Sequence, residues 1–181
     1  MRRIEEYVPV SWNGRHFRTR GYGSSDEPKI LDHFFFWKMT AVMAGFTDDK
    51  KPQMPETFSE RYCCLVCGLL HNLERTGPDA FVVDTDGRVE SAVEIKGTIT
   101  KGGFTSVGRS LNFDDLYWLS FASYDSLRYK ICRIKKPMIQ QIIRRSRFGL
   151  DRGTVNLKRI VDRFELRPTH VGYIGTVPED W

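Results

Sequence analysis

The chain has 181 residues, of which 40% are hydrophobic and 28% are charged. This composition supplies one compact core and excludes an intrinsically disordered protein, so a single domain over residues 1–181 is expected. The formal charge of +5, with a pI near 9.1, favours a polyanionic partner. No window approaches the roughly 20 apolar residues of a membrane span, and the start MRRIEEYVPV lacks the apolar run of a signal peptide. An intracellular, cytoplasmic protein without membrane contact is therefore expected.

The first predicted element is a β-hairpin over residues 6–20, because Asn13-Gly14 separates two strand-like runs. Its second arm carries Arg15, Arg18 and Arg20. These residues suit a DNA-contacting ribbon that binds phosphates, and they equally suit an ordinary solvated hairpin face. Both interpretations stay open from the sequence alone.

The segment from Lys29 to Phe46 predicts a helix, since its length and apolar density do not fit a strand. Such a helix is either largely buried or a contact between subunits. Residues 48–55, which contain two prolines, predict a loop.

A second helix is predicted from Thr57 to a stop at Gly77-Pro78, with Thr57 and Glu60 forming a capping box at its start. Within it, Cys63, Cys67 and His71 follow each other at helical i, i+4 spacing. A zinc site on this row is conceivable, but structural zinc usually takes two pairs of ligands and the second pair is missing. Small buried core residues account for the cysteines better, and no disulfide framework is expected.

The segment from Gly77 to Thr98 predicts a second hairpin and holds the candidate site. Phe81 to Val83 is strand-like, residues 84–87 (DTDG) supply turn chemistry, and residues 89–95 suit a second strand. Glu94 and Lys96 then point to the same face, and Asp79 stands at the start of the partner strand. Two converging carboxylates need a divalent cation between them, and their hard oxygens suit Mg²⁺ or Mn²⁺. A lysine beside that cation completes a site for attack on a phosphodiester.

The remaining predicted elements follow the hairpin in the order loop, two strands, helix, helix, strand. The loop, residues 97–112, is glycine-rich and offers Lys101 and Arg109 either to a phosphate backbone or to solvent. The strands cover 116–122 and 127–134, the helices 138–147 and 156–164, and the last strand 169–177. Arg144 and Arg145 end the first of these helices, where they suit either phosphate contact or the helix dipole.

A helix followed by Pro78-Asp79, and then by Glu94-x-Lys96 at the end of a strand, resembles the PD-(D/E)XK nuclease superfamily, which includes most type II restriction endonucleases. The resemblance covers roughly residues 57–136. It implies that Asp79, Glu94 and the main-chain carbonyl of Ile95 bind the metal. It also implies that Lys96 orients or helps to deprotonate the attacking water and stabilises the developing charge. Glu60 is a candidate for a further acidic group, although the predicted capping box already explains it.

We therefore expect an α/β or α+β domain with a central mixed sheet flanked by helices. Residues 57–147 would form the catalytic core, with additions at 1–56 and a basic extension at 148–181. The expected function is a Mg²⁺-dependent endonuclease on double-stranded DNA, a type II restriction enzyme in its simplest form. A junction-resolving or repair nuclease on the same core, and a non-catalytic DNA-binding or assembly module, are the alternatives. Because cutting both strands requires two sites, a homodimer is expected, with the helix over residues 34–46 as a candidate interface.

Overall fold

The computed structural model describes residues 7–47, 52–99, 103–107, 111–123, 126–145 and 154–174. Its strands are β1 (Val8–Trp12), β2 (Arg15–Arg20), β3 (Leu70–Asn72), β4 (Ala80–Val83), β5 (Val89–Thr98), β6 (Phe104–Ser106), β7 (Asp115–Phe121), β8 (Arg128–Lys135), β9 (Thr154–Asn156) and β10 (His170–Tyr173). Its helices are α1 (Glu27–Phe46), α2 (Glu56–Cys67), α3 (Lys136–Arg145) and α4 (Leu157–Arg163). Of the helices that these residues form, none combines the length and hydropathy that a membrane span requires.

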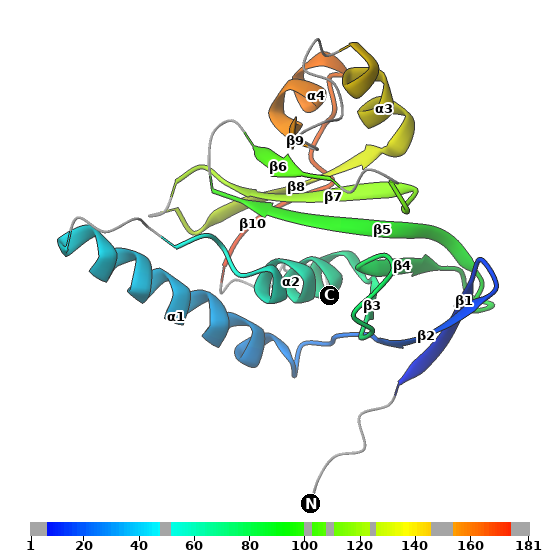
Figure 1. The fold of residues 1–181 in the computed structure, drawn as a ribbon. Coiled ribbons are helices and arrows are strands. Elements are labelled where there is room, and N and C mark those ends of the chain that lie inside the picture. Colours follow the sequence, from blue (N-terminus) through cyan, green and yellow to red (C-terminus); the bar gives the residue numbers. More distant parts are fainter. Residues whose placement is uncertain are drawn as a thin grey trace, which may run out of the picture.

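Eight strands form one mixed sheet in the order β1-β2-β3-β4-β5-β7-β8-β10 (Figure 1). The pair β5 and β7 is parallel, and every other pair in this sheet is antiparallel. Strands β6 and β9 form a separate two-stranded sheet. The predicted α+β fold with a central mixed sheet is confirmed.

Both faces of the sheet are covered, as Figure 1 shows: α1 and α2 lie on one side, and α3, α4 and the β6–β9 pair lie on the other. Strand β7 contributes side chains to the hydrophobic cores on both faces of the sheet. Tyr117, Leu119 and Phe121 pack toward α1 and α2. Its alternate residues Leu116 and Trp118 pack toward α3 and α4. A strand buried on both faces needs apolar side chains at nearly every position, which explains the continuous apolar run in the sequence.

The predicted N-terminal hairpin is confirmed as β1 and β2. Its two turn residues, Asn13 and Gly14, have φ angles of 49° and 74°, the left-handed conformation that a tight hairpin turn of this kind requires. Residues Thr19 and Arg20 of β2 then pair with β3, so the hairpin extends the central sheet.

The second helix is shorter than predicted. It ends at Cys67, because Gly68 adopts a left-handed φ of 63° and its N–H bonds back to the Cys64 carbonyl. The chain then forms β3, which the sequence pattern did not reveal because three residues are too few to show alternation. The predicted capping box is wrong, since Pro55 is the N-cap residue and makes no side-chain cap. The Glu60 side chain is consequently not engaged in capping.

Candidate active site

The candidate site lies where β4 and β5 separate. Val93 is the last β5 residue that pairs with β4, opposite Ala80 at the start of β4, and the Asp79 N–H donates to the Val93 carbonyl at 2.9 Å. Beyond this point β5 continues to Thr98 with β7 as its partner. The Asp79 carboxylate crosses the opening, because its Oδ2 accepts a 2.7 Å hydrogen bond from the Ile95 N–H. Asp79 is thus held at the freed edge of β5.

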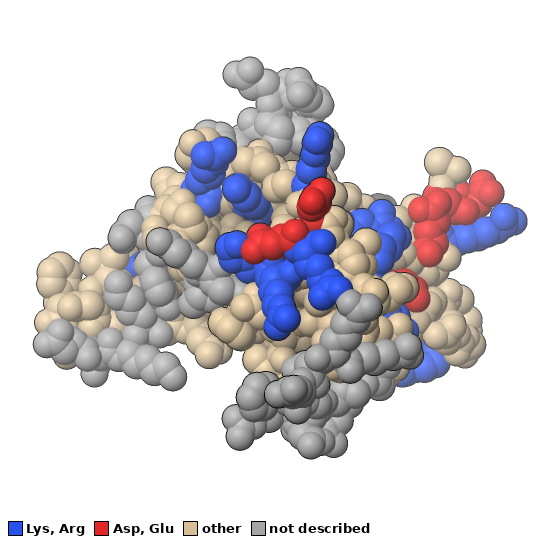
Figure 2. Space-filling view, turned by 90° about the horizontal axis from the view of Figure 1, so that it is seen from above, with Lys and Arg blue, Asp and Glu red and all other residues tan. Residues whose placement is uncertain are grey.

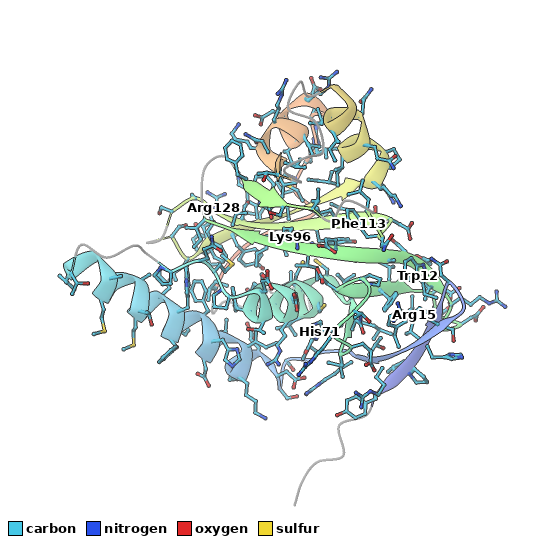
Figure 3. All side chains as sticks on the ribbon, in the orientation of Figure 1. Trp12, Arg15, His71, Lys96, Phe113 and Arg128 are labelled. Atoms are coloured by element: carbon cyan, nitrogen blue, oxygen red, sulfur yellow. The ribbon has the colours of Figure 1, made fainter. Side chains whose placement is uncertain are left out.

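Glu94 and Lys96 lie on the same face of β5, as predicted, while Ile95 between them is buried in the core. Lys96 Nζ is 2.7 Å from Glu94 Oε1, and the two side chains are only 22% and 18% exposed. Figure 3 shows Lys96 in the middle of the sheet, between the helical layers. An ion pair this well shielded from water is stronger than a surface pair.

The negative charge of Glu94 disfavours the ionised form of Asp79. Burial raises the pKa of Asp79 to about 7, with the nearby Glu94 charge as the second cause. For Lys96, burial alone lowers the pKa, but the Glu94 carboxylate outweighs it and the pKa lies above its usual value. The ionised form of Asp79 is therefore disfavoured in the isolated chain, because burial and the Glu94 charge outweigh the Ile95 hydrogen bond and the Lys96 charge.

A cavity of about 390 Å³ opens beside Lys96. Its walls come from the start of α2, the end of β5 and the β6–β9 pair. Glu56, in the first turn of α2, lines this cavity, and its charge contributes to the raised pKa of Lys96. Sequence reasoning missed Glu56. Glu56 immediately follows Pro55, and this position indicates the first turn of a helix. The predicted capping box at Thr57 placed the start of the helix one residue too late.

Glu60 enters the site from α2 as the end of a hydrogen-bonded chain. His71 Nε2 lies 3.3 Å from Glu60 Oε2, and His71 Nδ1 lies 2.8 Å from the Tyr22 hydroxyl. His71 is 8% exposed, so this chain is largely shielded from water. The Glu60 charge is among the causes that raise the pKa of Asp79, so the two carboxylates act on each other. Its proposed participation in catalysis stays a prediction.

The predicted row of Cys63, Cys67 and His71 is formed only by its two cysteines. Cys63 and Cys64 are buried in the core, and His71 belongs to β3 rather than α2. Cys67 Sγ instead lies 3.5 Å from Nδ1 of His170 on β10. A hydrogen bond from Cys63, with His170 contributing further, lowers the pKa of Cys67 to about 6. Among the described residues, no three His, Cys, Asp or Glu side chains converge on a metal position, so Cys63, Cys67 and His71 do not form the conceivable zinc site.

The predicted DNA-contacting arginines on β2 all have partners within the chain. Arg15 donates to Thr76, Arg18 pairs with Glu74 at 2.9 Å, and Arg20 pairs with Asp26 at 2.6 Å. Figure 3 shows Arg15 at the β1–β2 end of the molecule, apart from Lys96. Their role in DNA binding stays a prediction. Lys101 and Arg109 lie outside the described residues, as do the side chains of Arg144 and Arg145.

A second basic surface lies on the side of the sheet that carries α3 and α4. Figure 2, which looks down on this side, shows Lys and Arg side chains gathered with few acids among them. Lys158, Arg159 and Arg163 of α4 are exposed and line a shallow depression together with Asn156 and Asp162. Strand β9 connects this depression to the cavity beside Lys96, because Thr154 lines the cavity and Asn156 lines the depression.

The donor set at Asp79 and Glu94 fits a hard divalent cation. Both groups offer carboxylate oxygens, and a bound cation would offset the burial and the Glu94 charge that disfavour the ionised Asp79 carboxylate. In the part of the chain that the structure describes, no three His, Cys, Asp or Glu residues converge on one metal position. Mg²⁺ suits this arrangement, since it commonly takes one or two protein carboxylates and completes its shell with water and substrate phosphate.

The mixed sheet with acidic residues at its centre is consistent with a restriction endonuclease. Comparison with known families identifies the same class of protein. The family model that matches is the Bsp6I restriction endonuclease, over residues 22–146. The match spans more than half of the chain, and the chain belongs to the Bsp6I restriction endonuclease family. It contains α1 to α3 and all of the candidate catalytic residues. No curated protein and no solved structure matches the chain significantly.

Proposed function

We propose that this restriction endonuclease is a Mg²⁺-dependent type II enzyme with a catalytic centre of the PD-(D/E)XK kind. The single observation that carries the proposal is the convergence of Asp79, Glu94 and Lys96 where β4 and β5 separate. Asp79 immediately precedes β4, Glu94 and Lys96 belong to β5, and the family match includes all three residues. Mn²⁺ has similar ligand preferences and would substitute for Mg²⁺.

Each residue has a distinct task in this proposal. Asp79 and Glu94, with the Ile95 carbonyl, would hold the metal, and the Ile95 N–H fixes the orientation of the Asp79 carboxylate. Bound Mg²⁺ would supply Lewis-acid stabilisation of the phosphate and a lower pKa for water. Lys96 is held against Glu94, where its ammonium group orients the attacking water and stabilises negative charge that develops on the phosphate.

The acids of α2 form the outer part of the site. Glu56 lines the cavity beside Lys96, and Glu60 contacts His71 while its charge acts on Asp79. Neither carboxylate neutralises Lys96 directly, since the Lys96 ammonium pairs with Glu94. We propose that Glu60 orders water around the metal and that Glu56 restrains Lys96 through its charge.

The substrate would lie across β9. The catalytic cavity and the basic depression on α4 share this strand, so a DNA backbone that reaches Lys96 would continue over Thr154 and Asn156 toward Lys158 and Arg159. The three exposed cations of α4 suit phosphate contacts, which supply most of the affinity of proteins for DNA. Cleavage of both strands requires two catalytic sites, and we propose that a homodimer provides them.

The test is plasmid digestion with Mg²⁺, comparing the wild type with Asp79→Asn and Lys96→Ala. We expect discrete fragments from the wild type and a loss of roughly a hundredfold or more in each variant, the scale of removing one electrostatic catalytic group. Asp86→Asn is the matched control, because this exposed acid lies in the turn of the same hairpin. Full activity in both site variants would refute the catalytic assignment, and activity confined to branched DNA would refute the restriction function.

A further inference from the structure

An uncharged apolar surface runs along α1 on the side that faces away from the core. The helix buries Ile30, Phe34, Trp37 and Ala41 against the sheet and α2. Its opposite side would ordinarily be polar. It instead exposes six large apolar side chains, hereafter the apolar face of α1: Phe35 (46% exposed), Phe36 (74%), Met39 (64%), Val42 (52%), Met43 (64%) and Phe46 (84%).

Charge is nearly absent from this part of the helix. Between Phe35 and Phe46, the one charged residue is Lys38, which is half-buried with its Nζ 5.7 Å from the centre of the Phe34 ring. A phosphate backbone is recognised by cations, so the apolar face of α1 does not suit DNA. Among the described helices, α4 has the opposite character, with three exposed cations. The two surfaces thus suit different partners.

The size of the apolar face of α1 suits a protein interface. A fully exposed large side chain presents roughly 200 Å², so the six together present on the order of 700 Å². This exceeds the largest apolar patch of a typical monomer and approaches the roughly 800 Å² that each partner buries in a stable interface. Figure 1 shows that the C-terminal half of α1 extends past α2, which leaves it accessible to a second molecule.

We propose that the apolar face of α1 binds the same face of a second copy of this chain. In a two-fold interface the identical patch must complement itself, and an uncharged surface meets this condition because it brings no like charges together. Antiparallel packing of two α1 helices would set Phe35 and Phe36 of one copy against Met43 and Phe46 of the other. Methionine and aromatic side chains pack well against each other and adapt their shape.

Sedimentation velocity of the purified chain across a range of concentrations tests this proposal, and it needs neither DNA nor metal. We expect the wild type to be a dimer. Phe36→Glu with Met43→Glu should weaken dimerisation roughly a hundredfold or more, since each change buries a carboxylate in the interface. The matched control is Lys29→Glu with His33→Glu, which adds acids to exposed positions of the same helix before the apolar face begins. The control should remain dimeric.

Circular dichroism and thermal melting must show that the variants are folded. If the double variant is unfolded, the single change Met39→Lys, at a position that is 64% exposed, provides the same test. A monomeric wild type, or a folded variant that dimerises as the wild type does, would overturn the proposal. Because association is measured without cleavage, either result is independent of whether the proposed catalytic centre is correct.

Discussion

The Ile95 N–H and the Asp79 carboxylate are joined by a 2.7 Å hydrogen bond across the opening between β4 and β5. This bond satisfies a backbone donor at an edge where β5 no longer pairs with β4. It also holds Asp79 in a buried position beside Glu94, where a carboxylate is costly to ionise. Structure and proposed chemistry therefore depend on the same side chain.

Asp79 should make the metal-free protein less stable as the pH rises. Burial, and then Glu94, raise the pKa of Asp79 from 3.8 to about 7. Between these values the folded state keeps a proton that the unfolded state has released, so raising the pH favours unfolding by up to about 1.4 kcal/mol per pH unit. Urea unfolding in EDTA from pH 4 to 8 should show this loss, and Asp79→Asn should remove it.

Thermal melting of Asp79→Asn tests metal binding without measuring cleavage. Mg²⁺ should raise the melting temperature of the wild type above pH 7, because a ligand that binds only the folded state stabilises it. Asp79→Asn should abolish most of this rise, whereas Asp86→Asn should keep it. An equal Mg²⁺-induced rise in Asp79→Asn would contradict the metal assignment.

His71 should act as a positioning residue for Glu60. Removing it with His71→Ala frees the Glu60 carboxylate from its 3.3 Å partner, and we expect kcat to fall roughly tenfold with little change in KM. Glu60→Gln should have a similar effect. The double variant should be no worse than either single variant, because the two residues act as one unit. His16→Ala, at an exposed histidine of the N-terminal hairpin, is the control. Fully additive losses would show that His71 and Glu60 act separately.

Gly97 should be required for the close contact between β5 and α2. A Cβ at this position would lie 2.7 Å from Met54 Sδ and 2.7 Å from Ser59 Cβ. Gly97→Ala should therefore push the start of α2 away from Lys96, with a loss of about 1–3 kcal/mol in the free energy of unfolding and of most activity. Gly23→Ala, where the added Cβ meets no atom within 4 Å, should change neither. Chemical denaturation and plasmid digestion measure the two effects.

The cations of α4 should carry more of the DNA affinity than those of β2. Replacing Lys158, Arg159 and Arg163 by Gln should weaken binding at every sequence and reduce the salt slope by roughly one for each phosphate that is no longer neutralised. Arg15→Gln with Arg18→Gln should have a smaller effect, because these arginines already pair with Thr76 and Glu74. Binding is measured without metal so that no cleavage occurs. A larger change in slope from the β2 pair would favour the N-terminal hairpin as the DNA-contacting element.

Local chemistry in the sequence determined much of the fold. Asn13-Gly14 and the turn after Val83 specified two hairpins, because few residues other than Asn and Gly adopt the backbone angles of such turns. Alternation along β5 placed Glu94 and Lys96 on one face with Ile95 in the core. The order of Asp79, Glu94 and Lys96 then indicated a nuclease. Each of these inferences needed only residues near one another in the chain.

Tertiary structure decided the rest, because it depends on contacts between distant segments. Because α2 ends at Gly68, His71 belongs to strand β3, where its side chain contacts Tyr22 and Glu60. The short strand β9 connects the cavity beside Lys96 to α4, although three residues show no periodicity of their own. Apolar density predicted α1 but not which of its aromatic residues would be covered. Packing buried Phe34 and Trp37 and left Phe36 and Phe46 exposed, because a helix on one face of a sheet can bury only one side.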